Sequence, residues 1–116
     1  MKMKISKRIT TEAVRKYASA SQDLAAIHLD KAAAAEAGFQ RPIVHGMYLM
    51  GLAQSIYIAK HPALWITQYE MKFQKPILVD TIAIFDFEDS ECNIKVTVTT
   101  EEGDIIASGT FSVEEV

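Results

Sequence analysis

The sequence predicts an α+β domain in which an antiparallel sheet covers one central apolar helix. Residues 46–60 carry apolar side chains on nearly every face of a helix, whereas from Trp65 to the C-terminus apolar residues recur at every second position. The chain has 116 residues and no linker rich in proline, glycine or serine. We therefore expect a single domain, residues 1–116, with one core.

Composition argues against several classes of protein. Apolar residues make up 49% of the chain and charged residues 23%, which is typical of a soluble globular protein. The net charge is −3 and the basic residues form only short pairs, so no nucleic-acid-binding surface is expected. The single cysteine favours a reducing compartment, and neither a secretory signal nor an apolar stretch long enough for a membrane span is found. We expect a cytoplasmic protein with no membrane partner.

Two short helices are predicted before the central one. Thr10 can cap a helix over residues 11–18. Asp30 can cap a second helix formed by the alanine run at 32–35 and ended by Gly38. The segment between these two helices is expected to be a loop.

The central helix is predicted over residues 46–60. Because it is apolar all round, we expect it to be buried all round. His61-Pro62 ends it, since the residue before a proline is pushed out of the helical region. Gln54 and Ser55 are polar residues within it, and a hydrogen bond in the core explains them as well as contact with a substrate does.

After this helix the sequence predicts four strands in a meander, at residues 65–73, 81–88, 92–99 and 104–113. Cys92, in a β-rich run, is expected to be a buried structural thiol. The central helix has to cover the sheet, which fits a hotdog fold, an antiparallel sheet wrapped round an apolar helix. A sheet packed on helices in the ferredoxin style fits the same periodicity. Either sheet leaves a long exposed edge, so we expect a homodimer.

Asp23 and His28 are the polar residues that differ most from their neighbours. They face one another only if the four residues between them curl back. A carboxylate and an imidazole on one cavity can hold a water, one taking its proton and the other orienting it, and each well-placed group contributes roughly 10²–10⁴ in rate. On the residues alone, the simpler interpretation is an exposed loop acid and a hydrogen-bonded histidine beside the core.

Gly46 begins the central helix, where amide groups lack intrahelical acceptors and can donate to a developing oxyanion. A tight turn, or close packing of the sheet on the helix, explains this glycine equally well. His45 would then be a capping or packing residue. No metal is expected, because the histidines at 28, 45 and 61 have no recognised metal-binding spacing.

The segment SQDLAAIHLDKAAAAEAGFQRPIVHGM resembles the signature region of MaoC-like dehydratases, a family that includes the R-specific enoyl-CoA hydratases. The family pattern runs from an Asp, usually through Asn-Pro, to an aliphatic residue and His, and later has Gly-Phe and Pro-Ile-hydrophobic-His-Gly-Met. The principal matching positions are Asp23, Ile27, His28, Asp30, Gly38, Phe39, Pro42, Ile43, His45, Gly46 and Met47. The resemblance implies the hotdog fold.

The resemblance also implies reversible addition of water to a trans-2-enoyl thioester, giving an (R)-3-hydroxyacyl thioester. Asp23 would be the general base, His28 its water-positioning partner and proton donor, and Gly46 the donor to the thioester oxygen. Three further residues would contact the substrate: His45, Gln54 and Ser55. No cofactor is implied, because coenzyme A or acyl carrier protein arrives as part of the substrate.

One departure from the family pattern lies between the two catalytic candidates. Where the family usually has Asn-Pro, this chain has Ala25-Ala26, and their loss can loosen the loop that holds the water. Two alternatives therefore stay open: a non-catalytic subunit that binds acyl thioesters, and a hotdog thioesterase in which Asp23 activates water against the carbonyl. On so short a chain, a full active site would need a second subunit.

Overall fold

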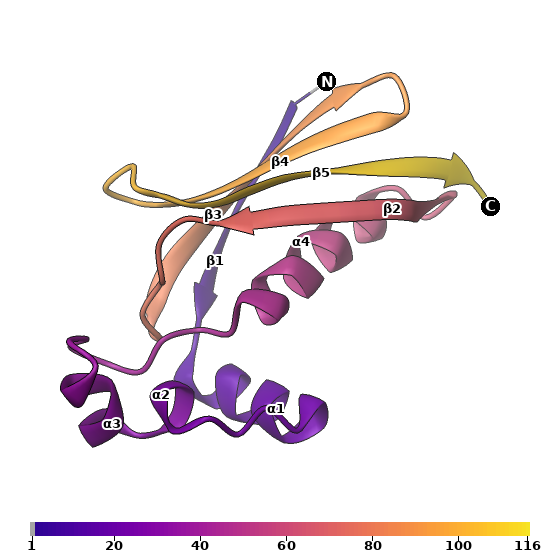
Figure 1. Ribbon diagram of the computed structural model, residues 1–116. Coiled ribbons are helices and arrows are strands. Elements are labelled where there is room, and N and C mark those ends of the chain that lie inside the picture. The colour runs from indigo at the N-terminus through magenta and orange to yellow at the C-terminus, as the bar shows by residue number, and fades with distance from the viewer. Residues whose placement is uncertain (1) are drawn as a thin grey trace.

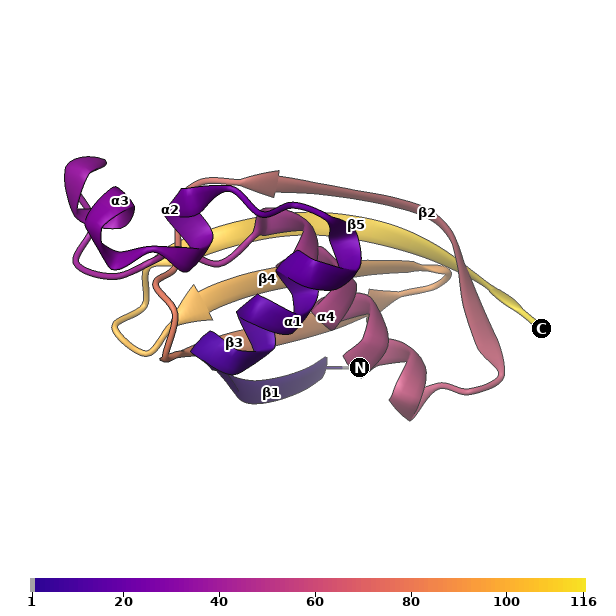
Figure 2. The same ribbon diagram turned by 90° about the horizontal axis from the view of Figure 1, so that it is seen from below.

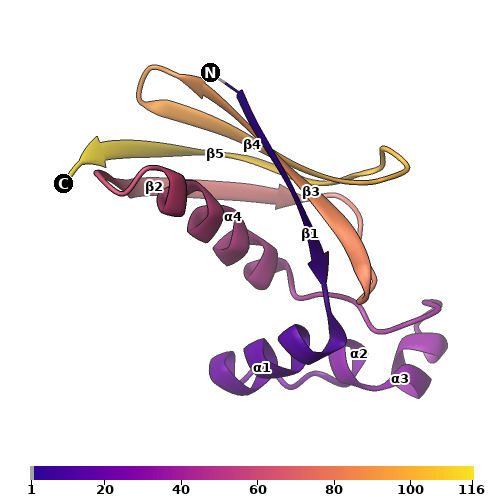
Figure 3. The ribbon, with the colours of Figure 1, turned by 180° about the vertical axis from the view of Figure 1, so that it is seen from behind.

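The computed structural model describes residues 2–116 and shows a curved sheet of five strands wrapped round one long helix (Figure 1). This helix, α4, spans Gly46–Lys60, as predicted. Three shorter helices, α1 (Thr11–Ser21), α2 (Ala26–Leu29) and α3 (Lys31–Glu36), gather near the N-terminal end of α4 (Figures 1 and 3). The predicted α+β class is confirmed.

The sheet has the strand order β1-β3-β4-β5-β2, and every neighbouring pair is antiparallel. Its strands are β1 (Lys2–Ile9), β2 (Leu64–Phe73), β3 (Thr81–Ser90), β4 (Asn93–Thr100) and β5 (Ile105–Glu115). Seen from below, β1 and β2 lie at opposite edges with α4 between them (Figure 2). The predicted meander is therefore partly wrong: β3, β4 and β5 form one, but β2 pairs with β5.

The connection between β2 and β3 explains this difference. Residues 74–80 are too many for a tight hairpin, and they cross from one edge of the sheet toward the other. At the start of the connection, the Gln74 N–H donates to the Ile106 carbonyl over 2.8 Å. Near its end, the Val79 N–H donates to the Pro42 carbonyl over 2.9 Å. The crossing therefore passes the segment that leads into α4 and helps to enclose that end of the helix.

The sequence pattern does not predict β1. Four of its eight residues are lysine or arginine, in the sequence KMKISKRI. Within residues 2–116 it pairs with β3 alone, at the edge of the sheet, and its last residue Ile9 is buried while most of its other residues are exposed. A charged edge strand resists pairing with other chains, but the same charges weaken the hydrophobic alternation by which a strand is recognised.

The two predicted helix caps are confirmed. The Thr10 hydroxyl accepts a hydrogen bond from the Ala13 N–H over 3.1 Å. The Asp30 carboxylate likewise accepts from the Ala32 N–H over 3.0 Å. Between these helices the chain is not entirely a loop, since α2 forms one helical turn there. That turn carries His28, so it controls where the imidazole lies.

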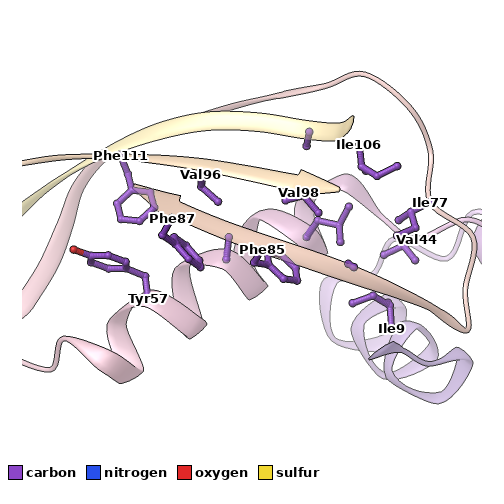
Figure 4. Packing of buried hydrophobic residues seen from close by; sticks show 14 of the residues in the cluster. Ile9, Val44, Tyr57, Ile77, Phe85, Phe87, Val96, Val98, Ile106 and Phe111 are labelled. Atoms are coloured by element: carbon purple, nitrogen blue, oxygen red, sulfur yellow. The ribbon is translucent and has the colours of Figure 1, made fainter. Parts of the chain in front are cut away.

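One face of α4 builds the core against the sheet (Figure 4). Leu49, Ala53 and Tyr57 are buried along this face. The Tyr57 ring meets Phe111 edge-on, with ring centroids 5.0 Å apart, and Phe87 at 5.7 Å. Each of these large side chains contributes about 1.5–3 kcal/mol by leaving water, so the C-terminal half of α4 is firmly fixed on the sheet.

The opposite face of α4 is not covered. Met47 is 63% exposed, and Gln54 and Ser55 are exposed as well. The prediction that α4 is buried all round is therefore wrong for the single chain, because the sheet reaches one side of the helix only. None of the helices within residues 2–116 is long and apolar enough to cross a membrane.

Cys92 also differs from its prediction. β3 continues to Ser90, which moves the turn to Glu91 and Cys92, with Glu91 in the left-handed region at φ 57°. Cys92 is consequently exposed at the tip of a hairpin. The prediction of a buried thiol is wrong, because the strand ladder extends two residues farther than the sequence pattern indicates.

Candidate active site

Asp23 follows the end of α1. Gln22 takes a left-handed conformation (φ 64°, ψ 17°) and ends the helix there. The Asp23 N–H donates to the Ser21 hydroxyl over 3.3 Å, and the Asp23 carbonyl accepts a hydrogen bond from His45 Nε2 over 3.0 Å. The backbone of Asp23 is thus held on both sides, while the residue itself stays exposed and its carboxylate can meet water.

His28 is fixed by the segment that leads into α4. Its Nδ1 donates to the Ile43 carbonyl over 2.7 Å, and the Ile43 N–H donates in return to the Ile27 carbonyl over 3.1 Å. Because a carbonyl can only accept, Nδ1 carries the hydrogen and Nε2 of the neutral ring keeps a lone pair. His28 can therefore accept a hydrogen bond, or a proton, at Nε2.

His45 contacts both Asp23 and His28 from the interior of the protein, and it is 2% exposed. Its ring stacks on that of His28, with centroids 3.7 Å apart and planes 20° apart. Tyr17 meets the His45 ring edge-on at 4.9 Å and lies 5.0 Å from Tyr48. Burial raises the pKa of Tyr48, so this hydroxyl is uncharged at neutral pH. The rings of His45, Tyr17 and Tyr48 therefore pack in series against one side of His28.

Side-chain ligand atoms of Asp23, His28 and His45 lie within 4.8 Å of one another. Such a group occurs in metal sites, but the in-plane lone pairs of two stacked imidazoles run side by side and do not converge on one ion. His45 Nε2 also already donates to the Asp23 carbonyl. A separation of 4.8 Å or less is one that a water can bridge, with hydrogen bonds of roughly 2.8 Å to Asp23 and His28.

A cavity of about 310 Å³ opens beside His28 at the N-terminal end of α4. His28 and Gly46 form part of its wall, together with apolar side chains that include Leu49, Phe73 and Ile77. Gly46 is the first residue of α4, so its N–H has no acceptor within the helix. The cavity thus combines an apolar lining with a free helix amide and an imidazole, as binding sites for small molecules commonly do.

Phe73 packs closely on Gly46. A Cβ added at Gly46 would lie 3.1–3.3 Å from three atoms of the Phe73 ring. Close packing of the sheet on the helix therefore does account for a glycine at position 46. The same packing leaves the Gly46 N–H available to donate a hydrogen bond. The sequence gives no sign of this contact. Phe73 ends β2, which pairs with β5, and nothing in that strand indicates that its last side chain reaches Gly46.

The structure brings Asp23, His28 and His45 together and places Gly46 in the same cavity wall as His28, but it does not bring Gln54 or Ser55 to them. The latter two lie on the exposed outer face of α4, and neither lines the cavity. Asp23 and His45 are also absent from the cavity wall, so His28 is the member of the polar cluster that reaches it. In the single chain, then, none of the three predicted substrate contacts reaches the cavity, whereas Phe73, which the sequence analysis missed, does.

Residues 1–112 match the MaoC like domain family. The chain belongs to this family. A MaoC-like relative, the (R)-specific enoyl-CoA hydratase of Aeromonas caviae, is 36% identical over 81 residues, which make up 67% of this chain and 60% of that protein. The mitochondrial 3-hydroxyacyl-[acyl-carrier-protein] dehydratase of Arabidopsis thaliana is 29% identical over 70 residues, or 60% of this chain and 42% of that one. The matches therefore span less than two thirds of either relative.

The fold of this MaoC-like domain has a close match among solved structures. The (R)-hydratase of Aeromonas caviae involved in PHA biosynthesis superposes with a TM-score of 0.87 at 26% identity, over 100% of this chain and 95% of that one. The hotdog fold and the family resemblance of the signature segment are thereby confirmed. The ferredoxin-style alternative is wrong, because five strands wrap a single helix.

Proposed function

We propose that this MaoC-like domain is a hydratase that interconverts trans-2-enoyl and (R)-3-hydroxyacyl thioesters. One observation carries the proposal: a carboxylate and an imidazole, Asp23 and His28, lie close enough to share a water beside a cavity that also contains the first amide of α4. Two relatives whose names place them on enoyl-CoA and on 3-hydroxyacyl carrier-protein thioesters support the choice of substrate class.

The Gly46 N–H polarises the substrate. A thioester oxygen placed at the start of α4 accepts this hydrogen bond and lies at the positive end of the helix dipole. Electron density drawn to that oxygen leaves C3 of the conjugated double bond electrophilic. The apolar side chains of Leu49, Phe73 and Ile77 enclose the acyl group and reduce competition from bulk water.

Asp23 and His28 supply the water. The Asp23 carboxylate accepts one hydrogen of the water and His28 Nε2 the other, which leaves an oxygen lone pair for C3. As the new C–O bond forms, Asp23 takes a proton and negative charge collects on the thioester oxygen. The proton is then delivered to C2 by way of these two side chains. The hydroxyl group of the water is now on C3 and its other hydrogen is on C2. Dehydration is the reverse.

No cofactor is part of this proposal, because coenzyme A or acyl carrier protein enters as part of the substrate. Lys75 lies in the cavity wall and forms a long ion pair with Asp104, at 3.4 Å, with both side chains more than half exposed. Such a pair is weak, so Lys75 is free to turn toward the phosphates of either carrier. The single free thiol, Cys92, agrees with a reducing compartment and keeps the cytoplasm as the proposed location.

Hydration of crotonyl-CoA, followed by the loss of enoyl absorbance, tests the proposal. Asp23→Asn and His28→Ala should each lower kcat by roughly 10²–10⁴. Asp23→Asn should leave the unfolding midpoint nearly unchanged, because Asp23 is exposed, whereas His28→Ala loses its bond to the Ile43 carbonyl and should lower the unfolding free energy by about 0.5–1.5 kcal/mol. Equal rates in the three proteins would refute the mechanism. Release of free thiol without hydration would indicate a thioesterase, and binding of the thioester without turnover a non-catalytic subunit.

We also propose that two copies associate along β2 and the outer face of α4. β2 is an edge strand whose one partner among the described residues is β5, and Trp65 on it is 58% exposed. Met47 on α4 is 63% exposed. Light scattering should give twice the 12.9 kDa of one chain. Trp65→Arg should shift the mass toward the monomer, whereas Lys4→Glu, on the opposite edge, should not. A wild-type monomer would contradict this proposal.

A further inference from the structure

His45 is the buried polar residue that the proposed mechanism does not use. It is 2% exposed and forms no part of the cavity wall. Burying an imidazole costs solvation free energy unless its nitrogen atoms find partners. Only one of them does: Nε2 donates to the Asp23 carbonyl, whereas Nδ1 is buried without a partner. An apolar residue would fill this space without that solvation cost, so the hydrogen bond from His45 to the Asp23 carbonyl points to a specific task.

The first contact of His45 holds the loop that carries Asp23. Ala25 and Ala26, which come after Asp23 and Leu24, have no side-chain groups that can form hydrogen bonds. The Asp23 N–H is bonded only locally, to Ser21. Among residues 2–116, the bond from His45 Nε2 to the Asp23 carbonyl is therefore the hydrogen bond that joins residues 23–26 to a part of the chain outside residues 21–30.

The second contact of His45 orients His28. The Nδ1 bond to the Ile43 carbonyl fixes one point of the His28 ring but leaves rotation about that bond. The His45 ring, stacked at 3.7 Å, removes this rotation by supporting one face. His45 itself cannot shift readily, because it is the N-cap residue of α4 and Tyr17 meets its ring edge-on. His28 Nε2 is thereby aimed in one direction.

We infer that His45 is a positioning residue that holds the Asp23 backbone and the His28 ring in register with each other and with the Gly46 amide. This inference rests on the proposed hydratase function. One rigid side chain, next to Gly46 in sequence, touches both members of the pair that shares the water. In this chain it replaces the loop rigidity that the alanines at 25 and 26 do not supply. Displacement of a reacting group by about 1 Å can cost 10²-fold in rate.

Two substitutions separate the two contacts. His45→Phe keeps an aromatic ring for stacking and removes the donor to Asp23, and His45→Gln keeps a donor and removes the ring. We expect His45→Phe to lower kcat for crotonyl-CoA hydration by about 10- to 100-fold with KM changed less than about twofold, and His45→Gln to recover part of that loss. His61→Phe is the matched control, since His61 also stacks on a ring at the other end of α4, and its kcat should not change.

Two further measurements exclude a purely structural role. In an Asp23→Asn background, His45→Phe should lower kcat by less than about twofold, because the carboxylate base that the His45 hydrogen bond positions is already lost. Hydrogen exchange should rise in residues 22–29 of His45→Phe and not in β3 or β4. Independent, multiplying losses in the double variant, or unchanged kcat and exchange in His45→Phe, would overturn the inference. If His45→Phe fails to fold, the same comparisons are made with His45→Gln.

The exchange measurement also keeps the two proposals apart. If wild-type protein does not hydrate any enoyl thioester, the hydratase function fails. Faster exchange of residues 22–29 in His45→Phe would then still show that His45 anchors the loop. If the wild type is active and neither kcat nor exchange responds to His45→Phe, the function stands and the positioning role fails.

Discussion

The two ends of α4 carry the same arrangement of stacked rings in different surroundings. At the N-terminal end His45 stacks on His28 at 3.7 Å, and at the C-terminal end His61 stacks on Tyr57 at 4.2 Å. Beside the first pair lies a cavity of about 310 Å³. The second pair borders the packed aromatic core around Phe111. Stacked histidines alone therefore say nothing about function.

What separates the two ends is how the helix's unpaired backbone groups are satisfied. At the C-terminal end the protein supplies the partners itself: the His61 N–H donates to the Ile58 carbonyl, and His61 Nδ1 donates to the Tyr57 carbonyl over 3.0 Å. At the N-terminal end Gly46 has no side chain to fill the space before its amide, and the cavity opens there. The cavity therefore lies at the end of α4 where the fold leaves a backbone donor without a side-chain partner.

Among substitutions that test the difference between the two ends of α4, Gly46→Ala is expected to have the largest effect on activity. The new Cβ would lie 3.1–3.3 Å from the Phe73 ring, so either the ring or the start of α4 has to move by a few tenths of an ångström. We expect kcat for crotonyl-CoA hydration to fall by about 10- to 100-fold while the unfolding free energy changes by less than about 1 kcal/mol.

A second substitution shows whether Phe73 causes this loss. In Gly46→Ala/Phe73→Leu the smaller side chain makes room for the methyl group, and part of the lost kcat should return. Phe73→Leu alone is the control for an effect on acyl binding, which would appear in KM. If the double variant is no more active than Gly46→Ala, the methyl group acts on the substrate and not on Phe73.

A smaller effect is expected at the closed end, and it concerns stability. The Tyr57 hydroxyl donates to the Asp89 carboxylate over 3.3 Å. Burial, with the nearby Asp89 charge and this hydrogen bond, raises the pKa of Tyr57 to about 12. Tyr57→Phe should lower the unfolding free energy at pH 8 by about 0.5–1.5 kcal/mol, as measured by urea denaturation, and leave kcat per folded molecule unchanged.

The same group gives stability a pH dependence of known sign. Its folded-state pKa exceeds the model-peptide value of 10.0, so the folded protein binds more protons than the unfolded one between these values. The stabilisation is complete below pH 10 and declines as the pH rises toward 12. Tyr57→Phe should flatten this decline without abolishing it, since burial also raises the pKa of Tyr69. An equally steep decline would contradict the assignment.

Local patterns were sufficient for the elements whose signals lie within a few residues. The caps at Thr10 and Asp30 and the C-terminal end of α4 follow from such signals, since a capping side chain or a proline acts on the adjacent turn. β1 could not be found in this way, because its lysines obscure the alternation. The pairing of β2 with β5 could not be found either, because register and order depend on where a connection crosses the sheet.

The sequence by itself determined the family and the α+β class, because a signature segment and an apolar helix are properties of neighbouring residues. It also singled out Asp23, His28 and Gly46 as the candidates for catalysis. Only the tertiary structure decided that His45 stands behind this group and that Phe73 closes on Gly46. Those contacts join residues far apart in the chain, and their distances are set by how the helices, the crossing connection and the sheet pack together.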